Sequence, residues 1–415
     1  MRKINNFLNK KIIKSLVVII IISTLPACDK SPSEHLQGLT EDKYPVANMP
    51  NEPLETPLEI NIEPKRLAMT SSWSAGVKDD GTLWTWGTDG LLRDTKTGQD
   101  PTPRQVEGVN DAVAVSGDGS HMLLLRKDGT VWGWGSNRYG EVDPNDDDTF
   151  IEELRQIKGI SDVVDIEADT YASIFLTKES KVYYLGSNQW HILKNVDKDK
   201  LDAPFKISGL KDISRIEGSS GYILALNTQG ELMTTYCIKN AVKVFDSDSN
   251  EICNIPFEKK VVDFAQGVAD FALLEDGSVW SWGQNFNGEA AQGKTNGEID
   301  IPTRIKGLSK VTNISSFAAN TLDGQLYTWG HYLIGESPEP MASSMRRLHE
   351  PILIKNDIEV SSFSSNAYIA GFTTKNGGVW FWEGNRSGQR GTGEVVDTFY
   401  EEYVFTPEKS LFTLN

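Results

Sequence analysis

The chain of 415 residues contains little histidine and little cysteine, with five residues of the first kind and three of the second. The histidines stand alone, without the spacing of a metalloprotease motif or of a Cys-His metal site. A Gly-x-Ser-x-Gly nucleophile elbow is absent from the sequence, and so is a phosphate-binding loop. We therefore expect no catalytic residues, no metal site and no cofactor, and we interpret the protein as a non-enzyme.

Basic residues are outnumbered by acidic ones, with 41 Lys and Arg against 58 Asp and Glu and a formal net charge of −17 at pH 7. An acidic body of this size repels the phosphates of nucleic acids and the head groups of anionic lipids. We therefore expect neither DNA nor RNA as a partner. Attachment to a membrane would have to come from acyl chains instead of surface charge.

The sequence also lacks an apolar run approaching the roughly 20 residues that a membrane-spanning helix needs. Its first residues are basic, no acidic residue precedes Asp29, and the short apolar run Leu16 to Ile22 lies between them. A basic start, a short apolar stretch and small residues before the cleavage point are typical of a secretory signal peptide. We assign residues 1–27 to such a peptide.

The tetrapeptide Leu25-Pro26-Ala27-Cys28 resembles the lipobox of bacterial lipoproteins. This resemblance implies cleavage before Cys28 and acylation of that cysteine, with chains such as palmitate. The protein would then be a membrane-anchored lipoprotein of a bacterial cell envelope, facing the periplasm or the exterior. In a host that sorts lipoproteins by the next residue, Asp29 would favour the inner membrane. An ordinary signal peptide followed by a chance cysteine is the alternative.

Residues 28–65 are rich in proline and poor in aromatic residues. This composition favours an extended, largely unfolded chain, so we expect a tether that holds the rest of the protein away from the membrane. Its last part, from Leu54 to Ile62, is more apolar and can pack on the domain that follows.

A segment of the form Gly-x-(Val/Leu)-aromatic-x-Trp-Gly recurs along the remaining chain. Clear copies occupy residues 81–87, 129–135, 277–283 and 324–330, a looser copy occupies 377–384, and degenerate copies end at Gly186 and Tyr236. The interval is about fifty residues throughout, which divides residues 66–415 into seven units. A period of this length is typical of a solenoid or a propeller.

Each unit contains an Asp-Gly pair or a variant of it between two runs rich in β-branched and aromatic residues, as at Asp128-Gly129. This pattern predicts a hairpin with a type I′ turn. A further β-rich run precedes the hairpin, and a proline-containing run follows it, as at Ile301-Pro302. Proline is tolerated only on an outer edge strand, so the pattern predicts four-stranded blades of a β-propeller.

Most of the 11 Trp residues fall in pairs two residues apart, such as Trp132 and Trp134. A spacing of two puts both rings on one face of a strand. Because buried aromatic rings dominate core energetics, we assign these residues to packing between blades and not to a ligand site.

The repeats resemble those of the RCC1 (regulator of chromosome condensation) family. The second unit carries the pattern as Gly117-x-x-Ser120-His121-x-Leu123-x-Leu125-x-x-Asp128-Gly129-x-Val131-Trp132-x-Trp134-Gly135-x-Asn137-x-x-Gly140. The resemblance covers residues 66–415 and implies an all-β, seven-bladed propeller whose two chain ends meet in or near one blade. Units three and four depart from the motif but keep the spacing, and His121 is expected to be structural.

With Cys28 assigned to the lipid, Cys237 and Cys253 remain. Both fall in the fourth unit, at the end of its third expected strand and near the start of its fourth. Neighbouring strands would allow a disulfide there, worth about 3 kcal/mol in the chain-entropy picture. Two buried thiols are the other possibility.

Two acidic loops, residues 143–148 and 246–251, alternate oxygen ligands as a calcium loop would, but both lack the expected glycine and final glutamate. We interpret them as solvated loops. Trp190 and His191 form an aromatic pair outside the repeat columns, and an exposed Trp in such a loop would mark a contact with a partner.

These observations favour a monomeric, non-catalytic scaffold that binds an unidentified protein, or less readily a glycan, through its loops. One alternative is a guanine-nucleotide-exchange-like regulator, as the family resemblance implies, and another is a secreted propeller hydrolase. Clustered channel acids with raised pKa would indicate the hydrolase, and the sequence shows no acid at a recurrent blade position.

The lipobox gives a direct prediction. The mature wild-type protein should incorporate radiolabelled palmitate, and Cys28→Ala should abolish the label because no acceptor sulfur remains. Cys253→Ala serves as the matched control and should keep the label. Palmitate on the Cys28→Ala protein, or none on the wild type, would contradict the assignment.

Overall fold

A computed structural model describes residues 46–61, 63–88, 92, 98–119, 121–189, 192–194, 196, 198–219, 221–246, 250–295, 297–330, 332–334, 345–355, 357–365, 369–383, 385–395 and 407–415. Cys28, Trp190 and His191 lie outside the described residues, as does the whole expected signal peptide. The described elements are all strands, and none of them is a helix. None of these described residues forms a helix with the length and hydropathy needed to cross a membrane.

The first three units form four-stranded antiparallel sheets in chain order. Blade 1 contains β1 (Leu67–Met69), β2 (Trp73–Val77), β3 (Leu83–Thr88) and β4 (Gln99–Gln105). Blade 2 contains β5 (Ala112–Asp118), β6 (His121–Arg126), β7 (Val131–Ser136) and β8 (Phe150–Gln156). Blade 3 contains β9 (Val163–Asp169), β10 (Ala172–Thr177), β11 (Val182–Gly186) and β12 (Phe205–Ile207).

Blade 4 departs from the pattern because it has a fifth strand. It contains β13 (Ile213–Ser219), β14 (Tyr222–Asn227), β15 (Leu232–Thr234), β16 (Val242–Asp246) and β17 (Glu251–Ile255). Strand β17 takes the fourth position beside β15, and β16 pairs with the outer side of β17. Blade 5 has the regular four strands β18 (Val261–Ala265), β19 (Ala269–Leu274), β20 (Val279–Asn285) and β21 (Gly297–Arg304).

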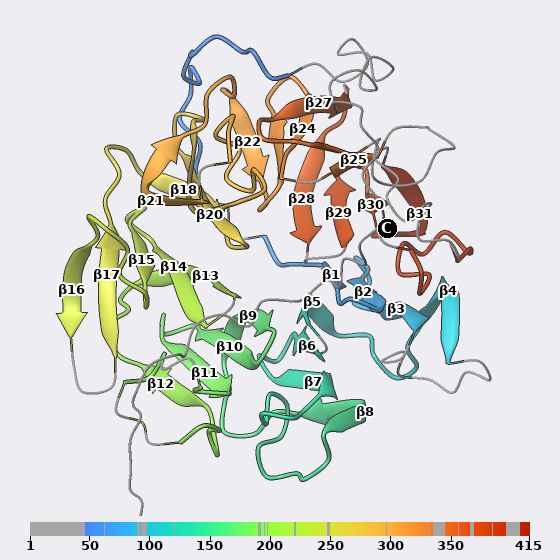
Figure 1. Cartoon of the computed structure of the whole chain (residues 1–415). Coiled ribbons are helices and arrows are strands. Elements are labelled where there is room, and N and C mark those ends of the chain that lie inside the picture. Colours follow the sequence, from blue (N-terminus) through green and yellow to red (C-terminus); the bar gives the residue numbers. More distant parts are fainter. Residues whose placement is uncertain are drawn as a thin grey trace, which may run out of the picture.

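The last two units complete the ring. Blade 6 contains β22 (Val311–Ile314), β23 (Ala318–Thr321), β24 (Leu326–Thr328) and β27 (Ile352–Lys355), with the separate hairpin β25 (Tyr332–Ile334) and β26 (Met345–Arg347) inserted before β27. Blade 7 contains β28 (Val360–Ser365), β29 (Ile369–Thr374), β30 (Gly378–Glu383) and β31 (Glu408–Thr413). The expected seven-bladed propeller is confirmed, with the first strand of each blade around the axis (Figure 1).

The hairpin turns differ from the expected type I′ geometry. Gly81 has a φ of 81°, but Asp80 is not among the residues with positive φ, and a type I′ turn requires both. The Asp80 carboxylate accepts hydrogen bonds from the Thr82 N–H and hydroxyl at 3.0 and 2.7 Å. This side-chain turn keeps Asp80 in a negative-φ conformation and leaves the left-handed position to glycine.

The same contacts explain a part of the repeat that packing alone does not. The Trp84 indole N–H donates to the Thr82 hydroxyl at 2.9 Å, so aspartate, hydroxyl and indole form a chain. Blades 2 and 5 repeat this chain with Asp128, Thr130 and Trp132 and with Asp276, Ser278 and Trp280. The motif Asp-Gly-(Thr/Ser)-x-Trp is therefore one hydrogen-bonded unit.

Asparagine fixes the loop between the third and fourth strands. The side-chain carbonyl oxygen of Asn285 accepts a hydrogen bond from the Ala290 backbone N–H at 3.0 Å. The side-chain amide of Asn285 donates to the Lys294 backbone carbonyl at 2.7 Å. Asn137, Asn188 and Asn385 make equivalent contacts in blades 2, 3 and 7. Blade 3 therefore keeps this device although its aromatic motif is degenerate.

The expected packing of tryptophan between blades is confirmed. The rings of Trp329 in blade 6 and Phe271 in blade 5 lie 5.3 Å apart, and those of Trp382 in blade 7 and Phe317 in blade 6 lie 6.4 Å apart. Trp86, Trp134 and Trp282 are likewise buried. His121 is buried too, with Nε2 3.1 Å from the Ser173 hydroxyl of blade 3, which fits its expected structural role.

The ring closes between blades 7 and 1, and in the part of the chain that the structure describes these two blades share no sheet, because each blade consists of one contiguous stretch of chain. Trp86 of blade 1 packs on Phe412 of blade 7 with ring centres 5.1 Å apart, and its indole N–H donates to the Gln389 carbonyl at 2.7 Å. The Asp79 N–H donates to the Leu414 carbonyl at 2.8 Å. The C-terminus therefore lies at this seam (Figure 1).

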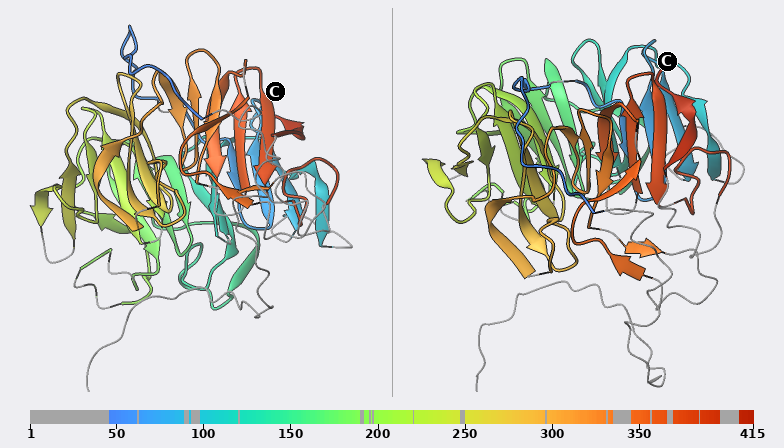
Figure 2. Two further views of the ribbon diagram at one scale, coloured as in Figure 1. Left: turned by 45° about the horizontal axis from the view of Figure 1, so that its top comes forward. Right: turned by 90° about the horizontal axis from the view of Figure 1, so that it is seen from above.

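Residues 46–66, here called the strap, run along the propeller before β1 (Figure 2). Val46 forms a β-bridge with Ile352 of blade 6, and the Met49 N–H donates to the Gly307 carbonyl at 2.9 Å. The N–H groups of Leu54 and Leu58 donate to the turn of blade 5 at 2.9 and 2.8 Å. This part of the expected tether is thus docked on blades 6 and 5.

The seam predicts a strong dependence of stability on Trp86. Trp86→Ala should lower the free energy of unfolding by about 3–5 kcal/mol, because it opens a cavity and removes the Gln389 hydrogen bond. Urea unfolding followed by fluorescence measures the loss. Trp132→Ala, at a partly exposed ring of blade 2, is the control and should cost clearly less. Equal losses would contradict the role of the seam.

Candidate functional site

The inner strands enclose a cavity of about 160 Å³ on the propeller axis. Its walls come from β5, β9, β13, β18, β22 and β28, and the end of the strap from Asn61 to Arg66 contributes as well. Propeller ligands need a concave place with convergent polar groups, and this cavity supplies both. We therefore treat it as the candidate site.

Four carboxylates from three adjacent blades line one side of the cavity: Asp165, Glu167, Glu217 and Asp263, here called the acidic arc. Asp165 and Glu167 are two residues apart on β9, so both point to the same side of that strand. The expectation that no acid occupies a recurrent blade position is wrong for blades 3 and 5. Counted from the first strand residue, Asp165 and Asp263 occupy the same place, and Arg215 takes it in blade 4.

Two cations cross-link the acidic arc. The Lys65 ammonium of the strap lies 2.5 Å from Glu167 and 3.7 Å from Glu217. The Lys65 carbonyl also accepts the Val115 N–H of β5 at 2.7 Å, which fixes the strap across the channel. Arg215 pairs with Glu217 at 2.9 Å and also with Asp263 of the next blade. The ion pairs thereby join blades 3, 4 and 5 with the strap.

Burial has the largest single effect on the pKa values of Lys65, Asp165 and Glu167. Burial raises the pKa of Glu167 to about 8 and outweighs the opposing charge of Lys65. Burial also raises the pKa of Asp165 against the effects of Lys65 and Arg215. For Lys65 burial acts to lower the pKa, but Glu167, Glu217 and Asp165 together hold it above its usual value.

The opposite wall is uncharged and rich in hydroxyl groups. It consists of Ser315, Ser316, Ser361, Ser362, Ser364 and Ser365, here called the serine arc. The Ser361 and Ser362 hydroxyls lie 2.6 and 2.7 Å from the Thr373 hydroxyl, and those of Ser316 and Ser365 lie 3.4 Å apart. The channel thus has one charged side and one hydroxyl side, a combination suited to binding a small polar molecule.

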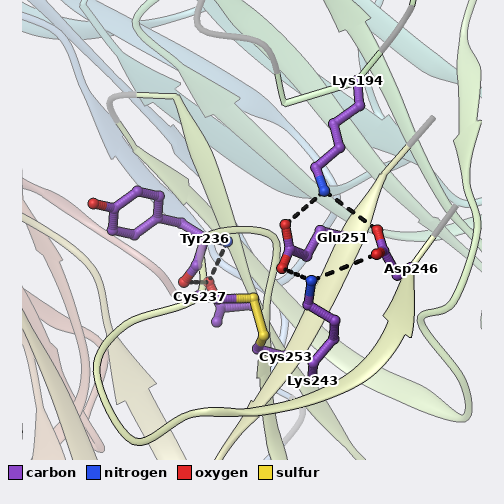
Figure 3. The surroundings of a disulfide bond; sticks show 8 residues. Lys194, Tyr236, Cys237, Lys243, Asp246, Glu251 and Cys253 are labelled. Atoms are coloured by element: carbon purple, nitrogen blue, oxygen red, sulfur yellow. Dashed lines mark hydrogen bonds and ion pairs between the residues drawn. A yellow bond between two sulfur atoms is a disulfide. The ribbon is translucent and has the colours of Figure 1, made fainter. Parts of the chain in front are cut away.

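The structure joins Cys237 and Cys253 of blade 4 by a disulfide, with a Cα–Cα distance of 5.4 Å and a sequence separation of 16 (Figure 3). Cys253 lies within β17, and Cys237 follows β15. A carboxylate oxygen of Glu251 and the two sulfur atoms lie within 4.8 Å of one another and form a group of possible metal ligands. Sulfurs bonded to each other are not thiolates, so this group does not hold a metal while the disulfide is intact.

An ion-pair network lies beside the disulfide, at the outer edge of blade 4 (Figure 3). The Glu251 carboxylate pairs with the ammonium groups of Lys194 and Lys243 at 2.5 Å each. Carboxylate oxygens of Asp246 lie 3.3 and 3.5 Å from the same two ammonium groups. The two lysines lower the pKa of Glu251.

Two described acids in each of the two acidic loops pair with cations. In the loop 246–251 they are Asp246 and Glu251, which face the two lysines, while residues 247–249 lie outside the described residues. In the loop 143–148, Asp143 and Asp146 pair with Arg155. This arrangement agrees with the interpretation of the two segments as acidic loops.

A buried carboxyl sits between blades 4 and 5. The Tyr222 hydroxyl lies 2.8 and 2.7 Å from the two oxygens of Asp270, which is nearly inaccessible to solvent. Burial raises the pKa of Asp270 to about 7, although the hydrogen bonds from Tyr222 and the Gly267 N–H act in the opposite direction. Sequence reasoning missed this group because no motif marks it.

The fold and its channel define a seven-bladed β-propeller protein. Residues 112–141 and 276–319 each match the regulator of chromosome condensation (RCC1) repeat. The chain therefore contains repeats of the RCC1 type, as the resemblance of its motif implied.

This chain matches only a small part of the length of the relatives described below. The human E3 ubiquitin-protein ligase HERC2 is 26% identical over 350 residues, which are 77% of this chain but 7% of that protein. The X-linked retinitis pigmentosa GTPase regulator homolog of Caenorhabditis elegans is 24% identical, with 66% of this chain and 20% of that protein covered. The chain thus spans far less than two thirds of either relative.

A solved structure of Prp20p from Saccharomyces cerevisiae is similar with a TM-score of 0.62 and 18% identity, covering 85% of this chain and 87% of that one. A structure of yeast RCC1 (Prp20) with Kap60 gives a TM-score of 0.61 at 17% identity, with 96% and 91% covered. At this identity the likeness supports the fold alone.

The Asp270 carboxyl predicts an unusual pH dependence of stability. The folded protein holds this proton more tightly than the unfolded chain, where the pKa is 3.8, so the free energy of unfolding should fall as pH rises from about 4 to about 7. The shift of about three units is worth at most about 4 kcal/mol. Glu167 should act in the same direction up to about pH 8.

Thermal unfolding of wild type and Asp270→Asn between pH 5 and pH 8 tests this. The variant keeps an acceptor for Tyr222 and should show a flatter profile. Asp300→Asn, at an exposed residue of blade 5, is the control and should keep the wild-type slope. A full slope in the Asp270→Asn protein would show that Asp270 is not its source.

Proposed function

We propose that the protein is a lipoprotein of a bacterial cell envelope, anchored through Cys28, whose propeller binds a partner protein without catalysing a reaction. The lipobox and signal peptide support the anchor. For the partner, the printed descriptions of similar structures speak of Prp20p binding to Gsp1p and histones and of Kap60 bound to yeast RCC1. Propellers of this fold therefore have protein partners, which supports the same role here.

The observation that carries the proposal is the outer edge of blade 4. Strand β16 pairs with β17 on one side, and no other described strand pairs with it. Val242 and Val244 of β16 are 56% and 49% exposed, and the nearby Tyr236 is 62% exposed. An edge strand with free backbone groups and exposed apolar side chains is a template for an added strand.

Three of the other outer strands are protected, whereas β8, β12 and β31 contain no proline. Proline interrupts β4 at Pro101 and Pro103 and β21 at Pro302, which removes hydrogen-bond donors from those edges. Strand β27 is bridged by Val46 of the strap. Strand β16 contains no proline and exposes two valines on a strand added outside the fourth position, which favours a role for its open edge.

The edge is also held rigid before a partner arrives. The disulfide from Cys237 to Cys253 closes the loop that contains β16, and the network around Glu251 fixes Lys194 and Lys243. A rigid strand loses little conformational entropy on binding, which favours affinity. The partner that fits is a protein with an extended segment able to pair as a further strand.

Two alternatives remain testable. A guanine-nucleotide exchange factor would share the protein-binding property, and only accelerated nucleotide release from a GTPase would distinguish it. A hydrolase is favoured by channel acids with raised pKa, and Asp165 and Glu167 are such acids. Lys65 pairs with Glu167, and Arg215 pairs with Glu217 and Asp263, which argues against a free nucleophile or general acid at these three residues.

Affinity capture from envelope extracts with full-length protein tests the proposal. Wild type should retain a specific protein, and the double variant Val242→Lys, Val244→Lys should retain at least tenfold less because charge opposes strand addition at an edge. Leu322→Lys, at a residue that is 68% exposed in blade 6, is the control and should bind normally. Unchanged thermal unfolding of the double variant shows that the fold persists.

Cys237→Ser gives an independent variant of the same surface, since it frees the loop of β16 without changing the two valines. It should weaken capture by several-fold. Equal recovery of the partner with all variants, or no protein above background with wild type, would overturn the proposed surface.

A further inference from the structure

We propose that the central channel is a binding site for a small linear organic amine with two or three ammonium groups. This goes beyond the partner-binding role, because it concerns the axis of the ring and not the rim. The charges of the cavity wall, the Lys65 ammonium already bound to that wall, and the size and chemistry of the remaining space all favour such a ligand.

The wall carries more negative than positive charge. The lining contains the four carboxyl groups of the acidic arc and Glu63, and its cations are Lys65, Arg66 and Arg215. With these carboxyl groups ionised, the lining has a net negative charge. Low-dielectric surroundings strengthen the attraction for a further cation, whereas an anion would be repelled.

Lys65 shows what kind of cation the arc accepts. Lys65 belongs to the strap and not to a blade, so the blades form an acidic recess that an ammonium group from outside the ring has filled. That ammonium contacts Glu167 and Glu217 directly, at 2.5 and 3.7 Å, without displacing Arg215 from Glu217. The geometry of the arc is therefore suited to N–H donors on a tetrahedral nitrogen.

The rest of the cavity suits the remainder of such a molecule. Serine hydroxyls on the opposite wall can accept hydrogen bonds from a second ammonium group, and Ile314 and Phe363 offer apolar surface to methylene groups. The volume of about 160 Å³ corresponds to roughly ten water-sized spaces at about 15 Å³ each. A flexible chain of that size fits.

A divalent metal ion fits less well. Calcium takes six to eight oxygen ligands at about 2.3–2.6 Å, and magnesium demands a near-ideal octahedron. Here Lys65 and Arg215 pair with Glu167, Glu217 and Asp263, and the hydroxyls lie on the opposite wall. An organic cation bridges such a divided wall better than a point charge does.

Calorimetric titration of the full-length protein in detergent with putrescine and with spermidine tests the site. Saturable binding with one equivalent is expected, weaker at high than at low salt. Glu217→Gln and Asp263→Asn should each weaken it about tenfold, which corresponds to about 1.4 kcal/mol. Glu153→Gln, at a side chain that is 80% exposed on blade 2, is the matched control and should bind as wild type does.

Lys65→Met provides the opposite change, because it removes the internal ammonium and leaves the arc unfilled. It should tighten binding of both amines, and this gain cannot arise from partial unfolding. The absence of saturable heat, equal or stronger binding of magnesium, equal weakening by Glu153→Gln, or weaker binding by a folded Lys65→Met protein would each overturn the proposal.

Discussion

The structure depends on one constraint, which is that every blade must bury both of its faces against neighbours in a closed ring. Tryptophan and phenylalanine at the strand faces satisfy it, as with Trp329 on Phe271 and Trp86 on Phe412. Large rings bury much apolar area with few rotatable bonds, so they set the distance between blades. The channel exists because this packing holds the first strands apart around an axis.

Much of the fold could be predicted from the sequence because its signals are local. The glycines at positive φ, the paired tryptophans and the proline on outer strands each act within a few residues, and their recurrence gives the number of blades. The turn type was wrong for an equally local reason, since the Asp80 side chain captures Thr82 and removes the need for a second positive φ. The fifth strand β16 was not predicted, because it belongs to no repeated sequence motif.

The channel could not be predicted in the same way, because its charges converge from distant parts of the chain. Lys65 and Glu167 are separated by 102 residues, and Arg215 meets Asp263 across a blade boundary. The recurrent position of Asp165 and Asp263 was present in the sequence but required the strand register to be seen. Buried charges of this kind are costly to desolvate, and strongly shifted pKa values cluster at functional sites.

The seam between blades 7 and 1 has a consequence for the history of this protein. Because no sheet among the described residues contains strands from both ends of the chain, each blade corresponds to one contiguous stretch of the amino-acid sequence. Duplication or loss of such a stretch would change the circumference of the ring without splitting a sheet. A propeller joined in this way can therefore vary its number of modules by simple recombination, provided that the aromatic contacts at the seam re-form.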